Sequence, residues 1–183
     1  MITNIHGYDS DGKNSKYRWL RKNYTDNIFS PTFNYSKDNP LNILNHLYNK
    51  IKLSKEDKHV IVASSLGGFF GYILHVIDPS IITILLNPSL IPFNNLMTKY
   101  HVDYHIIKMY ARLFGEYFYD YDFEYGFYDS LHVIYNPNDH IIDHHKTTLA
   151  ALPHSFSNIY KLKAPHSMPI KGEVEEIVRR LIT

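Results

Sequence analysis

The chain has 183 residues, 44% of them apolar, and its 19 Lys and Arg side chains nearly balance 18 Asp and Glu side chains, which leaves a net charge of +1. This length predicts a single domain, residues 1–183, that buries roughly 70% of the surface its unfolded chain would expose. The absence of Cys excludes disulfides, and the absence of a long Lys and Arg run argues against nucleic acid as a partner.

Short apolar runs alternate with longer stretches of helical periodicity, which is typical of βαβ units on a mostly parallel sheet. The predicted strands are Ile2 to Ile5, Asn27 to Tyr35, Lys58 to Ser64, Ile81 to Leu86, Leu131 to Tyr135 and His154 to Leu162. Pro31 interrupts the second strand and favours an edge position, whereas the third is apolar almost throughout and should lie at the sheet centre. We expect an α/β fold with five or six strands and helices on both faces.

Three helices are predicted, and the first two carry their own end signals. Asn39 can cap and Pro40 can begin a helix whose predicted buried residues are Leu41, Leu44, Leu47, Tyr48 and Ile51. Another helix begins near Gly67 and is closed by Asp78-Pro79. The last, from about Lys171, should turn one apolar stripe to the sheet, namely Val174, Ile177, Val178 and Leu181.

The segment from about Asn94 to Ser130 shows no strand pattern and holds eight of the sixteen tyrosines. Its second half carries Glu116, Asp120, Asp122, Glu124 and Asp129, with no Lys or Arg between Leu113 and Leu131. We interpret it as a helical insertion with an acidic, aromatic surface. Its tyrosines either pack on the core with their hydroxyls in water or face the substrate as a lid, and the sequence leaves both interpretations open.

The central strand ends in Ala63-Ser64-Ser65-Leu66-Gly67-Gly68, which has the form of a nucleophile elbow. In this turn the residues two before and two after the nucleophile must be small, because strand and helix backbones crowd there. Ser65 has Ala63 and Gly67 at these positions, whereas Ser64 would have larger residues at both. We therefore predict Ser65 as the nucleophile.

A nucleophilic serine needs a base, and the base needs a third group that holds its tautomer and orientation. Asp139 lies in the turn after the strand from Leu131 to Tyr135, where α/β-hydrolases carry the acid, and Asp143 is the alternative. His166 lies between the last strand and the last helix, where this fold delivers its base. The predicted catalytic triad is Ser65, Asp139 and His166.

An oxyanion hole needs two backbone N–H groups aimed at the charge that develops on the substrate. Leu66, directly after the nucleophile, can supply one of them. The other is expected from Tyr8 in the loop His6-Gly7-Tyr8-Asp9-Ser10, where Gly7 permits an unusual backbone conformation.

These motifs, with Asn87-Pro88-Ser89-Leu90-Ile91-Pro92 and Asn138-Asp139-His140, resemble those of the small bacterial YqiA/YcfP-type α/β-hydrolases along the whole chain. The resemblance implies a minimal α/β-hydrolase sheet. It also implies a serine esterase or thioesterase that cleaves small-molecule acyl esters without a cofactor, with the triad and oxyanion roles on the residues named above.

The sequence offers two alternatives to this function. His101 and His105 could share a helix face, and Asp139-His140 with Asp143-His144-His145 is rich in metal ligands, but neither set has the spacing of a recognised site and we expect no metal. The second alternative is a catalytically inactive binding protein on a hydrolase scaffold, because fold does not imply function.

No apolar run approaches the roughly 20 residues that a membrane helix needs, and the first residues show no cationic leader before an apolar stretch. We therefore expect a cytoplasmic protein without a membrane span.

Overall fold

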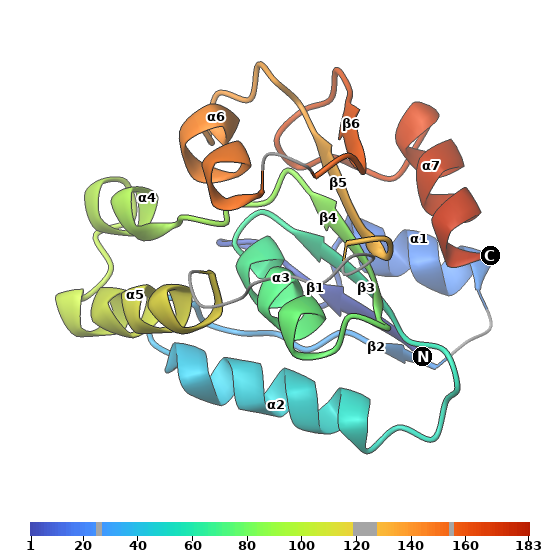
Figure 1. Cartoon of the computed structure of the whole chain (residues 1–183), viewed down its shortest axis with the longest axis horizontal. Coiled ribbons are helices and arrows are strands. Elements are labelled where there is room, and N and C mark those ends of the chain that lie inside the picture. Colours follow the sequence, from blue (N-terminus) through green and yellow to red (C-terminus); the bar gives the residue numbers. More distant parts are fainter. Residues whose placement is uncertain (25–26, 119–127, 154–155) are drawn as a thin grey trace.

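The computed structural model describes residues 1–24, 27–118, 128–153 and 156–183 (Figure 1). Within these ranges six strands form one sheet in the order β2-β1-β3-β4-β5-β6, and every neighbouring pair is parallel. The strands are β1 Ile2–Ile5, β2 Ile28–Phe29, β3 Val60–Ser64, β4 Ile82–Leu86, β5 Leu131–Tyr135 and β6 Ile159–Lys161. All six predicted strands are confirmed, with β2 at an edge and β3 inside the sheet; β2 and β6 are shorter than predicted.

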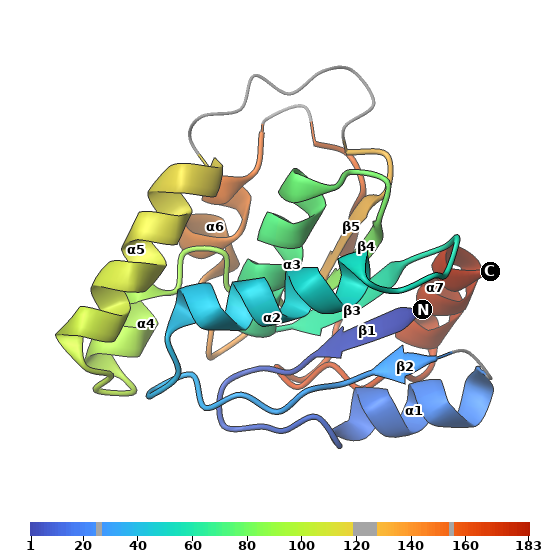
Figure 2. The ribbon, with the colours of Figure 1, turned by 90° about the horizontal axis from the view of Figure 1, so that it is seen from below.

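The helices are α1 Ser15–Asn23, α2 Pro40–Lys52, α3 Gly67–Ile77, α4 Phe93–Thr98, α5 Tyr104–Phe118, α6 His144–Thr147 and α7 Glu173–Ile182, with a 3-10 turn at Leu149–Ala151. Figure 2 shows α2 and α3 on one side of the sheet and α1 on the other. The buried residues separate in the same way, with α2, α3 and α5 contributing to one core and α1 and α7 to the other. The predicted α/β fold with helices on both faces is confirmed.

The central strand β3 shows why the two cores form. All five of its residues are buried, and successive side chains point to opposite faces, as they must in a strand. Ile61 and Ala63 belong to the core under α2 and α3, whereas Val60 and Val62 belong to the core under α1 and α7.

Helix α2 differs from its predicted burial. The Asn39 side chain caps it by accepting from the Leu41 amide, and Pro40 occupies the first turn as predicted. Leu41 is nevertheless 43% exposed, while Ile43 is buried in its place. The reason is helical phase, since Pro40, Ile43, Leu44, Leu47 and Ile51 share the face that lies against the sheet.

The predicted insertion begins as two helices, α4 and α5, between β4 and β5. Its described tyrosines differ in environment, because Tyr110 is fully buried, Tyr104 is 65% exposed and Tyr100 is half-buried against Tyr8. The carboxylates of Asp120, Asp122 and Glu124 and the tyrosines at 119, 121 and 125 lie outside the described residues.

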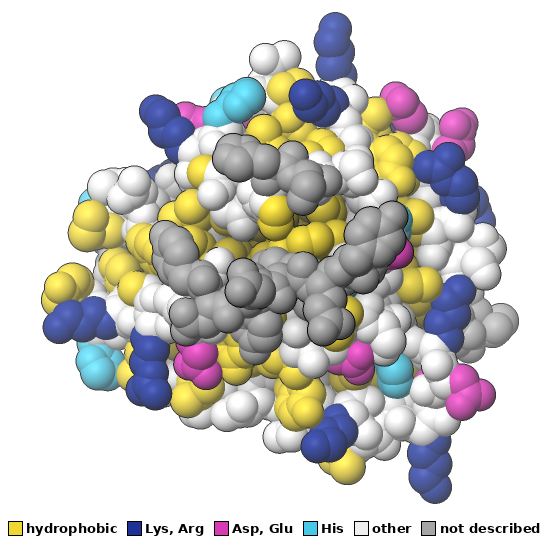
Figure 3. All heavy atoms as spheres, in the orientation of Figure 1, with side chains coloured by type: hydrophobic (Ala, Val, Ile, Leu, Met, Phe, Trp, Pro, Cys, Tyr) yellow, Lys and Arg dark blue, Asp and Glu magenta, His cyan; other side chains and the backbone are white. Residues whose placement is uncertain are grey.

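Charged side chains are distributed in small numbers over the face in Figure 3, with Lys and Arg mostly near its outline and hydrophobic side chains nearer its centre. Among the described residues, no helix is both long and apolar enough to cross a membrane.

Candidate active site

The site lies where five parallel strands end at the same edge of the sheet. Ser65 directly follows β3 and has a φ of 52°, in the left-handed region that side chains other than glycine rarely adopt. Its amide donates to the Leu86 carbonyl at 3.1 Å, and its own carbonyl accepts from Gly68 and Ser89 at 2.9 and 3.0 Å. These bonds hold the serine in a strained turn between β3 and α3, as the elbow pattern predicts.

Two glycines lie close to the turn of this serine, one at the start of α3 and one in the loop after β1. A side chain at Gly67 would overlap the backbone carbonyls of Ile5 and His6. The position two residues after Ser65 is therefore crowded, as the elbow motif predicts. A side chain at Gly7 would come within 2.8 Å of the Ser65 Cβ. The loop after β1 therefore lies directly against the serine because residue 7 has no side chain.

The structure brings Ser65, Asp139 and His166 into one line of contacts. The His166 Nε2 atom lies 3.1 Å from the Ser65 Oγ, and Nδ1 lies 2.7 Å from the Asp139 Oδ2. The Asp139 side chain is fully buried and the His166 ring is 21% exposed. Asp143, the alternative acid, instead caps α6 by accepting from the Lys146 amide, and its half-exposed carboxylate pairs with the Lys146 ammonium at 3.3 Å.

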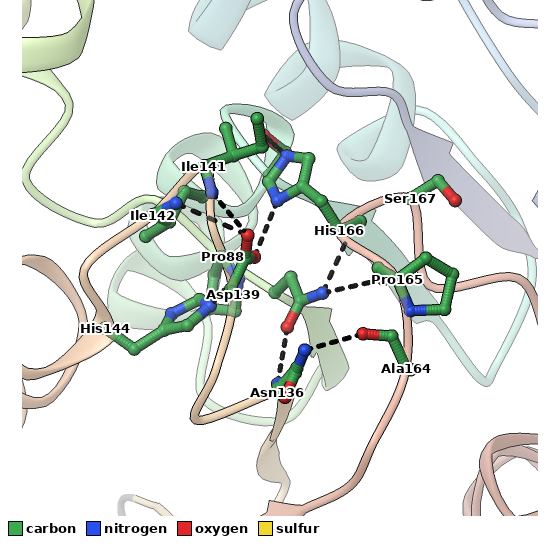
Figure 4. A network of polar contacts seen from close by, with 12 residues as sticks. Pro88, Asn136, Asp139, Ile141, Ile142, His144, Ala164, Pro165, His166 and Ser167 are labelled. Atoms are coloured by element: carbon green, nitrogen blue, oxygen red, sulfur yellow. Dashed lines mark hydrogen bonds and ion pairs between the residues drawn. The ribbon is translucent and has the colours of Figure 1, made fainter.

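The Asp139 carboxylate accepts hydrogen bonds at both oxygens (Figure 4). Oδ1 accepts from the amides of Ile141 and Ile142 at 2.8 and 3.4 Å, while Oδ2 faces His166 and a second histidine, His144, at 3.3 Å. Burial alone would raise the pKa of Asp139, but the hydrogen bonds from His144, His166 and Ile141 outweigh it and hold that pKa well below its usual range. The carboxylate is therefore ionised when it faces His166.

His144 is a site residue that sequence reasoning missed as a partner of Asp139. Its side chain is fully buried, and its Nδ1 lies 2.9 Å from the Thr148 Oγ1, which in turn donates to the Pro88 carbonyl at 2.6 Å. The contacts link the Asp139 turn to the loop after β4. The available sequence signal was the histidine-rich run that begins at residue 140, which does not say which ring faces inward.

Asn87, the residue after β4, connects two of the loops that carry the candidate triad. Its Oδ1 accepts from the Asn136 amide at 2.7 Å, and its Nδ2 donates to the carbonyls of Pro165 and His166 at 3.3 and 3.0 Å. Its side chain therefore fixes the spacing between the turn of Asp139 and the loop of His166. The Asn-Pro motif after the fourth strand marks this residue without indicating its partners.

Two further side chains hold the His166 loop. Asn136 donates to the Ala164 carbonyl at 2.7 Å, and the buried ammonium of Lys16 donates to the Ser167 carbonyl. Burial lowers the pKa of Lys16 to about 8. The loop is thus anchored on both sides of His166.

The loop after β1 is held by His6, which is fully buried. Its Nδ1 donates to the Gly7 carbonyl at 2.7 Å, and its Nε2 accepts from the Phe33 amide at 2.9 Å, so the ring must be neutral to make both bonds. Burial lowers the pKa of His6, while the Gly7 carbonyl acts in the opposite direction. Among the described residues, neither the Tyr8 amide nor the Leu66 amide has a protein acceptor, so both N–H groups remain available.

A small pocket of about 20 Å³ opens beside the serine. Its lining is Tyr8, Ser65, Leu66, Ser89, Pro92, Asn95, Leu96, Tyr100, Ile141 and Ile142. Where the chain is described, no three His, Asp or Glu side chains gather in a way that could hold a metal ion.

Comparison with known proteins identifies relatives in sequence and in fold. A UPF0227 protein from Shewanella woodyi is 28% identical over 102 residues, which are 54% of this chain and 56% of that protein. The chain therefore matches little more than half the length of this curated relative.

Several solved structures share the fold at low sequence identity. Mouse alpha/beta hydrolase domain-containing protein 10 has a TM-score of 0.66 at 14% identity, with 99% of this chain and 87% of that chain covered. Est1E from Butyrivibrio proteoclasticus has a TM-score of 0.63 at 11% identity, covering 98% and 84% of the two chains. Acyl-protein thioesterase 2 from Zea mays has a TM-score of 0.53 at 14% identity, covering 99% and 90%. These similarities show that the chain has a minimal α/β-hydrolase fold.

The first 113 residues also match a family described as an uncharacterised protein family, UPF0227. Because this match covers well over half of the chain, the protein belongs to UPF0227, in agreement with its resemblance to the YqiA/YcfP-type proteins.

Proposed function

We propose that the protein is a serine hydrolase that cleaves acyl esters or thioesters through a covalent acyl-enzyme. The observation that carries this proposal is the line of contacts from the Ser65 Oγ through the His166 ring to the buried Asp139 carboxylate. In such an arrangement the histidine accepts the serine proton, and the carboxylate stabilises the imidazolium that forms.

Acylation begins when the Ser65 Oγ attacks the acyl carbonyl carbon while its proton passes to the His166 Nε2. The carbonyl oxygen becomes an oxyanion, which the amides of Tyr8 and Leu66 can stabilise in a preorganised position. The intermediate then collapses, the bond to the leaving group breaks, and the leaving oxygen or sulfur takes the proton from His166. The products of this half are the free alcohol or thiol and the acyl group on Ser65.

Deacylation repeats these steps with water. His166 removes a proton from a water molecule as its oxygen attacks the acyl carbon, and collapse of the second intermediate returns that proton to the Ser65 Oγ. The carboxylic acid leaves and the serine is restored. Acyl-protein thioesterase 2 from Zea mays, one of the fold neighbours, has a name that is compatible with this chemistry.

A fluorophosphonate probe tests the proposal directly, because it reacts with activated serines. We expect stoichiometric labelling of Ser65 and hydrolysis of p-nitrophenyl acetate. Ser65→Ala should abolish labelling and lower turnover by roughly 10⁴-fold or more, whereas Ser64→Ala, one residue earlier, should retain most of both.

If Ser64→Ala abolished labelling and turnover while Ser65→Ala retained them, the nucleophile would be Ser64. A folded protein that neither labels nor turns over any ester would instead support the alternative of an inactive binding protein.

A further inference from the structure

Two tyrosine rings from different parts of the chain form one side of the pocket beside Ser65. Tyr8 follows β1 and Tyr100 follows α4, and their rings stack with centroids 4.0 Å and planes 28° apart. Rings at this separation are in van der Waals contact, so no alkyl chain passes between them. The Tyr8–Tyr100 pair therefore joins the loop after β1 to the insertion as one wall.

Hydrogen bonds fix the neighbouring walls. The Asn95 carbonyl accepts from the Tyr100 amide at 3.1 Å, and the Asn95 side chain donates to the Ile141 carbonyl at 3.4 Å. These bonds connect α4 to the turn that carries Asp139. Leu96, on the same wall, is 1% exposed and belongs to the main core. Widening the pocket on this side would therefore disturb packed side chains.

The volume of the pocket limits what it can hold. One water molecule needs roughly 10–15 Å³ of such space, and a methyl group is of similar size. The pocket is narrow, with about 20 Å³ of such space, and it is partly open to solvent, so its enclosed part beside Ser65 has room for about one such group.

The residues around the pocket indicate which part of an ester occupies it. The lining includes Ser65 and the two residues with the candidate oxyanion amides, Tyr8 and Leu66. His166, which would protonate the leaving group, is not among the described lining residues. The acyl substituent therefore faces the pocket, and the leaving group lies on the side of His166.

We infer that this site is selective for esters of short acyl groups, of two or three carbons, and that Tyr100 sets this limit. The inference rests on the proposed hydrolase function and specifies its substrate class. It also gives one tyrosine of the insertion a role in substrate selection, whereas Tyr110 of the same segment is a core residue.

The test is a series of p-nitrophenyl esters from acetate to octanoate, in which only the acyl chain changes. We expect kcat/KM to fall beyond the propionate, since one methylene too many in an apolar pocket costs roughly 10- to 200-fold. Tyr100→Ala should raise the hexanoate-to-acetate ratio of kcat/KM by about 10-fold or more, and Tyr100→Leu should raise it less.

Two control variants separate the effect of side-chain size at position 100 from other effects of the substitution. Tyr100→Phe keeps the ring and should keep the chain-length profile, while Tyr104→Ala makes the same truncation at a 65% exposed tyrosine and should leave both the profile and the rate unchanged. Thermal unfolding identifies any variant that has failed to fold, and the wild-type profile tests the inference without a variant.

A wild-type enzyme that cleaves the octanoate as efficiently as the acetate would overturn the inference while Ser65 still reacts with the fluorophosphonate. An unchanged ratio in folded Tyr100→Ala would also overturn it. Absence of both labelling and turnover would instead refute the proposed function, and the inference with it.

Discussion

Asp139 and Asp143 are two carboxylates of one segment with different surroundings. Asp139 is buried between two histidines, whereas Asp143 caps a short helix at the surface. We therefore expect Asp139→Asn to lower kcat by about 10⁴-fold, since an amide cannot stabilise the imidazolium in the same way. Asp143→Asn should change kcat by less than about threefold. Steady-state kinetics on p-nitrophenyl acetate measure both, and a larger loss in Asp143→Asn would reverse the assignment.

His144 tests whether the second histidine positions the acid. His144→Phe preserves a ring but removes the donor to Asp139, so the carboxylate loses one restraint and His166 is held less firmly. We expect kcat to fall by roughly 10-fold with little change in KM, as for other lost supporting hydrogen bonds. The matched control is His145→Phe at the exposed neighbouring position. Equal changes in kcat for the two variants would contradict a positioning role.

At the scale of single residues, the sequence predicts the candidate triad because each member follows a strand in a recognisable order. The partners of Asp139 and the bonds of Asn87 were not predictable in the same way. The Asn87 side chain bonds backbone groups 49 and 79 residues away, which come together only when β4, β5 and β6 lie side by side. His144 lies only five residues from Asp139, but the histidine-rich run does not indicate which ring faces the carboxylate. Periodicity and motif spacing contain no information on such contacts.

At the scale of elements, the loop after β1 depends on a neutral His6. Burial lowers the pKa of His6 below its usual value of 6.5, so the unfolded chain binds this proton more readily than the folded protein does. The contribution of neutral His6 to the free energy of unfolding is complete above pH 6.5. It is lost progressively as the pH falls from 6.5 to the lower pKa of the folded protein. Burial also lowers the pKa of His132 in β5, so this histidine contributes to the pH dependence of stability in the same direction.

We therefore expect the free energy of unfolding to fall on acidification below about pH 6.5, by at most about 1.4 kcal/mol per pH unit for each histidine. Urea unfolding between pH 5 and 8 measures this slope. His6→Gln, which keeps a donor and an acceptor but does not titrate here, should show a shallower slope, and His145→Gln should match the wild type. A slope unchanged in His6→Gln would show that His6 does not contribute.

The elements also show where sequence patterns fail. The four inner strands lie within two residues of their predicted bounds, because buried parallel strands are nearly continuous apolar runs, as β3 and β5 are. The edge strands β2 and β6 are much shorter than predicted. Helix α1 was not among the predicted helices, since only Lys16 and Leu20 of its nine residues are buried. In α2 the first turn was misjudged because the apolar character of Leu41 does not reveal which way it faces.

At the scale of the whole molecule, two cores share one sheet. Leu47 of α2 and Leu20 of α1 are both fully buried, one in each core. We expect Leu47→Ala and Leu20→Ala each to lower the free energy of unfolding by about 2–5 kcal/mol, and the double variant to be additive within about 0.5 kcal/mol. Leu53→Ala, at an 81% exposed position, should change it by less than about 0.5 kcal/mol.

Urea unfolding should remain a single transition in all of these variants, because every strand between the cores belongs to both. Two separate transitions, or a double variant far from the sum of the single ones, would show that the cores unfold or couple differently.

The separation of Ser65 and His166 along the chain has a consequence for the order of folding. Their side chains meet across 101 residues, through a sheet whose strands pair only in parallel and therefore only after long connections have closed. Local turns such as the elbow can form early, but a reactive serine exists only once β6 has docked on β5. Recovery of fluorophosphonate labelling during refolding would thus report on the docking of β6, which requires long-range contacts that a single helix does not need.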